Sequence, residues 1–282
     1  MERAVTLFVA ALTTTVLMGA CGAAPQRVEV GELRTETRSV EVENAESVKV
    51  NLRLAVGELT VGGGAEEPRL MEADFAYNVA AWEPGLDYEV VGDSGELTVH
   101  QRGLTEGIPT RDVRNEWDLR LNDVVPVDLT VQIGGGVGNL DLDNLALTGM
   151  NLNVGAGSTR VDLSGEWKRD LSAIVRGGAG QLTVLLPSRM GVKVNAGTRL
   201  GRVNAEGLQR EGKSFVNDAF NDSDATLRVE VTGGVGQINL EVVQQQGDPQ
   251  QGNPQRGGTG GTTMMQDSTI TIMQPGGNTI GQ

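Results

Sequence analysis

Hydrophobic and polar residues alternate along most of the chain between residues 47 and 243. A two-residue period places successive side chains on opposite faces of an extended backbone, so it predicts β-strands with one buried face. Val127-Asp128-Leu129-Thr130-Val131 and Gln181-Leu182-Thr183-Val184-Leu185-Leu186 are clear examples of such runs. The pattern therefore predicts an all-β fold built from short strands.

Glycine-rich cassettes interrupt this alternation at regular intervals. Three of them are nearly identical: Gly135-Gly136-Val137-Gly138-Asn139-Leu140, Gly177-Gly178-Ala179-Gly180-Gln181-Leu182 and Gly233-Gly234-Val235-Gly236-Gln237-Ile238. Because glycine adopts a positive φ easily and lets backbones approach closely, each cassette predicts a corner between two strands. With looser copies included, the corner glycines fall at 57, 95, 138, 157, 180, 201 and 236, with central steps of 19, 23 and 21 residues. A step of about 20 residues predicts a solenoid-like stack.

Two ligand-binding interpretations of the cassettes fail on the residues that follow the glycines. A phosphate-binding glycine loop leads into a helix N-terminus, whereas strand-like runs follow here. A calcium-binding nonapeptide repeat needs an aspartate two residues after its third glycine. That position holds Leu140, Leu182 and Ile238, so we expect the cassettes to be structural.

The N-terminus has the features of a bacterial export signal. An apolar run from Ala4 to Met18, broken only by threonines, is followed by small residues and by Cys21, the single cysteine of the chain. A run of this length with small residues at its end predicts a secretory signal. Met18-Gly19-Ala20-Cys21 resembles a lipobox, which implies cleavage before Cys21 and its acylation. The alternatives are an ordinary cleaved signal, or a plain membrane anchor, with an incidental cysteine.

Composition changes along the chain divide it into zones. We expect a lipoprotein signal peptide at 1–20, a tether and first strand at 21–46, an N-terminal β part at 47–125, a repeat β-solenoid part at 126–243 and a flexible, disordered Gln/Gly-rich tail at 244–282. Between the two β parts, Gly103–Asn122 breaks the alternation with Pro109, Trp117 and mixed charges, which predicts a long loop or a domain seam. The tail is too poor in apolar residues to offset the entropy of ordering.

The net charge of the chain limits its partners. At pH 7 it is −14, and removal of residues 1–20 leaves it unchanged because Glu2 and Arg3 cancel. Nucleic-acid binding needs basic patches, so this charge predicts no nucleic-acid partner. The same charge argues against electrostatic docking on anionic lipid, which leaves acyl chains on Cys21 as the predicted membrane attachment.

Residues with catalytic potential are few. His100 is the single histidine, and without a Gly-x-Ser-x-Gly elbow or a zinc-type Cys/His cluster we interpret it as surface. Asp141 and Asp143 are a carboxylate pair that a glycosidase could use, and Glu230 across from the amide of Asn239 is the other candidate pair. Sugar-processing solenoids also present aromatic platforms, whereas the aromatic residues here are sparse and scattered: Trp82, Trp117, Trp167, Tyr77 and Tyr88. We predict no catalytic residue and no cofactor.

One acidic segment, Asp218-Ala219-Phe220-Asn221-Asp222-Ser223-Asp224, has side-chain oxygens that suit calcium. It lacks the fixed glycine and distal glutamate of an EF-hand, so a turn-forming loop is the favoured interpretation. Whether Asp218, Asp222 and Asp224 bind a cation stays open, and we predict no metal site.

The repeated strand–glycine–strand segments and the run Val127–Val131 before the first triple-glycine corner resemble the bacterial toast-rack domain and related adhesin-like families. The resemblance covers roughly residues 46–243. It implies a right-handed, β-helix-like stack of short strands on an envelope-anchored protein, with no assigned enzymatic activity and no agreed functional residues.

Two functions remain as hypotheses. The first is a non-catalytic, lipid-anchored protein on the extracytoplasmic side of the bacterial cell envelope that binds, adheres or senses envelope stress, with an envelope protein or glycan as partner. The second is a carbohydrate-active enzyme on a β-helix scaffold. Carboxylates and basic groups clustered beneath a cleft would favour the enzyme. The sequence leaves open the ligand, the process, the inner or outer membrane, the oligomeric state and whether the tail orders on binding.

Overall fold

The computed structural model describes residues 29–103 and 112–243. These residues form a 13-stranded open sheet and one short 3₁₀ helix, η1 (Ala80–Trp82), so the all-β, stacked fold is confirmed. Six strands are long: β2 (Ser47–Gly62), β7 (Val127–Asp141), β8 (Leu147–Asp162), β9 (Leu171–Pro187), β10 (Gly191–Glu206) and β13 (Thr226–Val243). The shorter strands are β1 (Arg34–Glu41), β3 (Arg69–Tyr77), β4 (Pro84–Val91), β5 (Ser94–Gln101), β6 (Asn115–Leu121), β11 (Gln209–Glu211) and β12 (Ser214–Val216).

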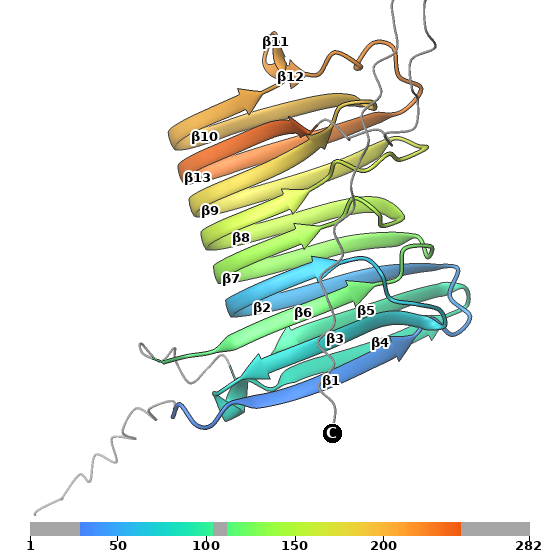
Figure 1. Cartoon of the computed structure of the whole chain (residues 1–282), viewed down its shortest axis with the longest axis vertical. Helices are drawn as coiled ribbons and strands as arrows, with labels where there is room; N and C mark the ends of the chain where they lie inside the picture. The colour runs from blue at the N-terminus through green and yellow to red at the C-terminus, as the bar shows by residue number, and fades with distance from the viewer. Residues whose placement is uncertain (1–28, 104–111, 244–282) are drawn as a thin grey trace, which may run out of the picture. The chain divides into compact units, whose positions relative to one another are not determined.

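Each long strand bends near its middle, and the bends lie above one another (Figure 1). The bend contains a glycine with positive φ in every case: Gly57, Gly136, Gly157, Gly180, Gly201 and Gly236. The two halves of a strand therefore lie in two layers, and alternate side chains from both halves fill the space between them. Leu52 before the bend of β2 and Leu59 after it are both 0% exposed and belong to one core.

The long strands are parallel and in register, but their order is not the order of the sequence. The stack runs β2-β7-β8-β9-β13-β10, so the last strand of the described chain lies between β9 and β10. The step of 21 residues from Gly180 to Gly201 thus connects strands that are not neighbours. The spacing of the corner glycines therefore does not give the order of these last two strands.

The register also corrects the alignment of the cassettes. Gly136, not Gly138, pairs with Gly157 of β8, and Gly157 pairs with Gly180 of β9. The predicted alignment is shifted by two residues, which is one full period of a strand, so the shift leaves side chains on the correct face. The aliphatic residues that excluded calcium are indeed buried: Leu140, Leu182 and Ile238.

Gly95 is not a corner, contrary to the prediction. It lies buried in β5, which pairs with the first half of β2, and its φ is not positive. A Cβ there would lie 2.9 Å from the hydroxyl of Tyr88, so close side-chain packing rather than a bend accounts for the glycine.

The shorter strands extend the two layers at one end of the stack. β3 is antiparallel to both β1 and β6, and these three strands continue the layer of the second halves, while β5 and β4 continue the layer of the first halves. β6 lies inside Gly103–Asn122, so the prediction of a loop is wrong for residues 115–121. Trp117 is 1% exposed and packs edge-on against Phe75, with ring centroids 5.4 Å apart, while the mixed charges form the outer face of the strand.

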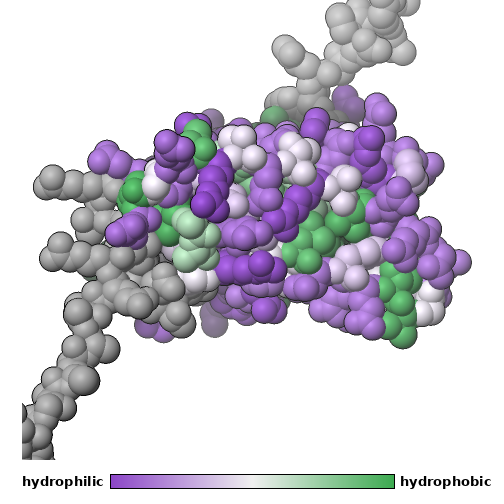
Figure 2. Space-filling view, turned by 90° about the horizontal axis from the view of Figure 1, so that it is seen from below, coloured by the Kyte–Doolittle hydropathy of each residue, from purple (hydrophilic) through white to green (hydrophobic). Residues whose placement is uncertain are grey.

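The end of the stack formed by β1 is largely polar. Figure 2 shows this end, where hydrophilic side chains dominate and hydrophobic patches are separated. Arg38 of β1 donates to Glu36 at 2.8 Å and pairs with Glu83 at 3.3 Å. Charges on an edge strand hinder pairing with another chain, because a further strand would desolvate them.

The predicted zones can now be placed on the fold. β1 falls inside 21–46, and the division between 47–125 and 126–243 falls between β6 and β7, although β2 pairs with strands on both sides of it. That division stays a prediction. Residues 1–20, Cys21 and residues 244–282 lie outside the described residues. Within the described ranges, no helix has the length and apolar character needed to span a membrane.

Candidate binding groove

A groove with a volume of about 780 Å³ crosses five strands on the outer surface of the first-half layer, directly before the bends. Residues from β5, β2, β7, β8 and β9 line it: Arg53, Leu54, Ala55, His100, Gln101, Gln132, Ile133, Gly134, Asn153, Val154, Gly155, Arg176, Gly177 and Gly178. Because it crosses the strands, it presents the same position of successive strands side by side.

One side of the groove is a row of polar side chains. The in-register pairing aligns one residue of each strand, and neighbouring strands are about 4.8 Å apart. The row, called the groove row below, consists of His100, Arg53, Gln132, Asn153 and Arg176. These side chains point outward because their neighbours Leu52, Leu54 and Val131 point into the core.

The floor of the groove is bare backbone. A Cβ on Gly134 would lie 2.4 Å from the carbonyl oxygen of Ala55, and one on Gly155 would lie 2.2 Å from that of Gly134. Gly178 repeats the contact at 2.1 Å from Gly155. Stacked backbones approach too closely here for any side chain, so the packing of the fold itself leaves the floor open to a ligand.

The groove carries positive charge in an acidic chain. Arg53 and Arg176 are exposed, and neither takes part in an ion pair with another described residue. Arg176 donates a long hydrogen bond of 3.4 Å to Asn151, and the Nδ1 atom of His100 lies 3.6 Å from a carboxylate oxygen of Asp87. The lining residues include no aspartate, glutamate, serine, threonine or cysteine.

Gln101 closes the groove at β5. Its side-chain oxygen accepts hydrogen bonds from the backbone N–H groups of Ala55 at 3.0 Å and Val56 at 3.2 Å, which fixes the start of the bend in β2. The residue is 3% exposed, and its side-chain nitrogen has no hydrogen-bond partner among the described residues. This nitrogen is enclosed by protein atoms, so Gln101 supports the bend of β2 and does not contact a ligand in the groove.

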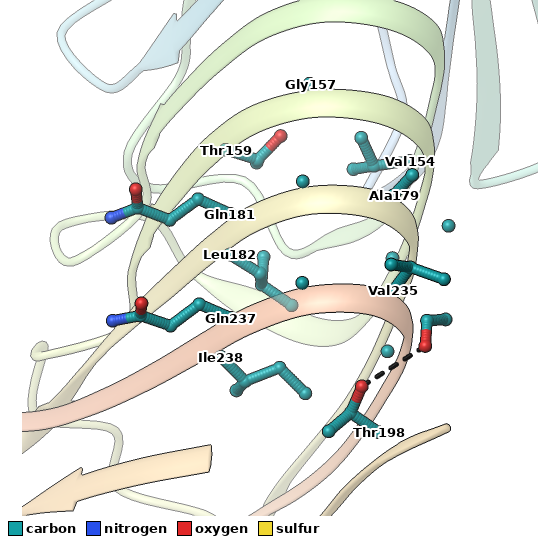
Figure 3. A pocket seen from close by; sticks show the side chains of 16 residues that line it. Val154, Gly157, Thr159, Ala179, Gln181, Leu182, Thr198, Val235, Gln237 and Ile238 are labelled. Carbon is teal, nitrogen blue, oxygen red and sulfur yellow. Dashed lines mark hydrogen bonds between the residues drawn. The ribbon is translucent and has the colours of Figure 1, made fainter. Parts of the chain in front are cut away.

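A second, much smaller cavity lies inside the bends of β8, β9 and β13 (Figure 3). Its volume of about 20 Å³ has room for roughly one water molecule. Leu182 and Ile238 point into it, whereas Gln181 and Gln237 point away, and the buried hydroxyl of Thr159 has no described partner. We attribute this cavity to packing around glycine rather than to a ligand.

The structure separates most of the residues with catalytic potential. Glu230 and Asn239 lie in different layers, where Glu230 pairs with Asn195 and Asn239 with Asn204. Trp82 and Trp117 are each 1% exposed, and the indole N–H of Trp167 donates to the carbonyl of Leu145 at 3.2 Å. Trp82 and Trp117 are therefore unavailable for sugar stacking, and Trp167, which is half-buried, lies outside the groove.

Asp141 and Asp143 do lie together, at the end of β7 beside Asp162. Burial raises the pKa of Asp143 most, and the neighbouring charge of Asp141 and then of Asp162 raises this pKa further. Asp218 of the acidic loop accepts a hydrogen bond of 2.7 Å from Gln209. Among the residues that the structure describes, no group of three or more His, Cys, Asp or Glu side chains is placed to hold a metal ion.

Sequence reasoning found only one member of the groove row, His100, and treated it as surface. The other members share a simple signal: each lies four residues before a positive-φ glycine, as Arg53 precedes Gly57 and Arg176 precedes Gly180. The row can be recognised only when the strands are aligned on these glycines. The predicted alignment of the first cassette used Gly138 instead of Gly136, so it was two residues off and did not show the row.

Comparison with known proteins agrees with this architecture. Residues 29–185 match the family described as "N-terminal domain of toast_rack, DUF2154", which is more than half of the chain and includes every residue that lines the groove. The chain belongs to the toast-rack family. The crystal structure of a "putative cell adhesion protein" from Clostridium sporogenes ATCC 15579 is 34% identical, with a TM-score of 0.70 over 75% of this chain and 100% of that chain.

Two further solved structures share only a weak similarity with this toast-rack protein. A "putative adhesin" from Bacteroides fragilis is 10% identical, with a TM-score of 0.24 over 74% of this chain and 97% of its own. A "putative lipid binding protein" from Parabacteroides distasonis is 12% identical, with a TM-score of 0.27 over 76% and 99%. Neither similarity carries an argument about fold or function. No curated protein matches the chain.

Proposed function

We propose that this toast-rack protein is a non-catalytic adhesive module of the bacterial cell envelope and that the groove is its contact surface. The observation that carries the proposal is an open groove across five strands, lined by guanidinium, imidazole and amide groups on a bare backbone floor. Such a surface suits many weak polar contacts along an extended ligand. The name of the Clostridium sporogenes relative, a "putative cell adhesion protein", supports the same role.

The chemistry of the lining supports binding rather than catalysis. Glycoside hydrolysis uses two carboxyl groups, and nucleophilic catalysis uses a hydroxyl or thiol beside a base. His100 is the one acid–base group among the lining residues, and it has neither kind of partner in the groove. The alternative, a carbohydrate-active enzyme, would need its carboxylates elsewhere, as in the cluster around Asp143.

Lipid anchoring at Cys21 is part of the proposal. The apolar run before Cys21 and the small residues that flank it support cleavage and acylation there, and acyl chains would hold the module at the membrane surface. Mass spectrometry of the mature N-terminus tests this step. We expect an acylated Cys21 as the first residue, and a Cys21→Ser variant should remain uncleaved or leave the membrane fraction. An unmodified wild-type Cys21 would refute the anchor.

The adhesive role is tested with full-length protein in liposomes on a glycan array that includes envelope polysaccharides. We expect retention on a subset of glycans without release of shortened products. Release of products would support the enzyme instead. Loss of retention in a variant of the groove row, with retention by a variant elsewhere on the surface, would place the contact in the groove.

A further inference from the structure

We propose that the groove binds an extended acidic polysaccharide whose carboxylates engage Arg53 and Arg176. This inference rests on the proposed adhesive function and names the chemistry of the ligand. Both guanidinium groups belong to the groove row, Arg53 on β2 and Arg176 on β9, and two strands lie between them. Three strand spacings separate them, or about 14 Å.

The charges of the two arginines are available to a ligand. Neither side chain has an ion-pair partner among the described residues, although Asp and Glu outnumber Lys and Arg by 37 to 23 in the whole chain. The planar guanidinium group matches a carboxylate with two parallel hydrogen bonds. Two exposed, unpaired guanidinium groups in one groove therefore favour a ligand with repeated negative charges.

The side-chain amides between Arg53 and Arg176 are suited to hydrogen bonds with the hydroxyl groups of a ligand. Gln132 makes no side-chain hydrogen bond with another described residue, and the amide nitrogen of Asn153 donates to Asn151 at 3.1 Å, which leaves its oxygen as an acceptor. Amides both donate to and accept from hydroxyl groups. Charge, amide, amide, charge is the order that a polyhydroxylated acidic chain would meet.

The direction of the groove argues against a peptide strand. A peptide that adds to a sheet pairs with an exposed edge, along the strand direction. The groove instead runs across strands whose backbone groups are already paired with both neighbours. A ligand here contacts side chains and glycine surfaces, and a polysaccharide advances by roughly one strand spacing per sugar unit, so its groups can meet successive strands.

Titration calorimetry with polygalacturonate tests the inference, because its methyl ester has the same backbone without the charge. The full-length protein in nanodiscs should bind polygalacturonate, and the methyl ester should bind far more weakly. Added salt should weaken binding to the acid form, because salt screens exposed charges. Equal binding of the acid and its ester would overturn the proposal.

The variants are matched in charge. Arg53→Gln with Arg176→Gln should lower the affinity about a hundredfold, at about tenfold per charge-assisted contact. Arg160→Gln with Arg202→Gln removes two exposed arginines of the second-half layer and should change the affinity less than about threefold. None of these four arginines forms an ion pair with another residue in the described ranges, so thermal midpoints should stay close to that of the wild type. Equal losses for the two double variants would refute the groove as the site.

Three further outcomes bear on this inference and on the proposed function. Binding of inorganic polyphosphate but not of polygalacturonate would replace the acidic polysaccharide with a phosphate polymer and overturn the inference. Groove-dependent retention on neutral glycans alone would leave the adhesive function standing while refuting the acidic ligand. The absence of any glycan retention, with no binding of polygalacturonate, would refute both.

Discussion

A Cβ atom on Gly157 would lie 1.8 Å from the carbonyl oxygen of Gly136 on the neighbouring strand. The same contact recurs along the stack, at 1.9 Å for Gly180 against Gly157 and 1.9 Å for Gly236 against Gly180. Each of these glycines also has a φ between 129° and 136°. Two independent causes therefore require glycine at the bend of each long strand: the positive φ and the close approach of the neighbouring strand.

Gly157→Ala should strongly destabilise the protein. The methyl group would meet a backbone oxygen that cannot move without breaking the ladder, and a positive φ is itself strained for alanine. We expect a loss of about 3 kcal/mol or more in the free energy of unfolding, measured by chemical denaturation.

Gly197→Ala in β10 is the control for this bend. Its φ is not positive, and a Cβ there would meet nothing within 4 Å. The change should alter stability by less than about 1 kcal/mol. Similar losses in Gly157→Ala and Gly197→Ala would contradict the account of the bends.

Asn217→Asp should destabilise the loop between β9 and β10. The buried amide of Asn217 donates to the carbonyls of Pro187 at 3.0 Å and Met190 at 2.8 Å, and it accepts from the N–H of Val192 at 2.9 Å. A carboxylate would face two carbonyl oxygens without a proton, so we expect a loss of more than about 2 kcal/mol at pH 7. Thermal unfolding would measure it.

The pH dependence of that variant follows from the same contacts. Burial and the two carbonyls would raise the pKa of the introduced carboxyl in the folded protein, so the loss should shrink as the pH falls and the group is protonated. Asn204→Asp, whose amide bonds to Asn239 on the exposed surface, should change stability little at any pH. A loss in Asn217→Asp that is independent of pH would contradict this explanation.

Asp143→Asn should stabilise the protein slightly at neutral pH. The pKa of Asp143 is raised in the folded state, by burial first and by the charge of Asp141 next, so its ionisation opposes folding. Below the unfolded value of about 3.9 the penalty is absent, and it grows as the pH rises through the folded pKa. We expect a gain under about 1 kcal/mol at pH 7 and none at pH 3, from denaturant midpoints.

Asp128→Asn removes the same charge from an exposed position on the other layer and controls for net charge. It should give a smaller gain than Asp143→Asn. If Asp143→Asn proved less stable than the wild type at pH 7, the repulsion inferred around Asp141 and Asp162 would be wrong.

Gln101→Ala should loosen the bend of β2. It removes the acceptor for the N–H groups of Ala55 and Val56, which leaves two donors unpaired, at about 1–3 kcal/mol for a buried donor. Gln132→Ala, in the same groove but without side-chain hydrogen bonds to described residues, should change stability by less than about 0.5 kcal/mol. Equal stability of the two variants by denaturation would contradict the structural role of Gln101.

The sequence predicted the strands and the buried faces because alternation is a local property that each segment carries by itself. It also predicted the corners where glycine is required by its own backbone: Gly57, Gly157, Gly180, Gly201 and Gly236. The predicted corners at Gly95 and Gly138 were wrong because glycine also occurs where a neighbouring side chain needs space. Tyr88 needs it at Gly95, and Thr159 needs it at Gly138. Spacing alone does not distinguish these two causes.

The order of the stack and the groove row depend on pairing between distant segments. β13 inserts between β9 and β10, and this choice is made by tertiary packing and not by any local pattern. Arg53 and Arg176 are 123 residues apart in the chain, from 53 to 176, and only the shared register brings them into one row. The groove therefore could not emerge before the strand order was known.

The most direct test of the central claim is a map of the polygalacturonate contact by heteronuclear NMR of the full-length protein. We predict that chemical shifts change first for the floor glycines Gly134, Gly155 and Gly178 and for the side chains of Arg53 and Arg176, while signals of the second-half layer, such as that of Arg160, stay unchanged. Saturable changes confined to the second-half layer would contradict the claim that this groove is the contact surface, and no change at millimolar sugar-unit concentrations would contradict the claim that it binds an acidic polysaccharide.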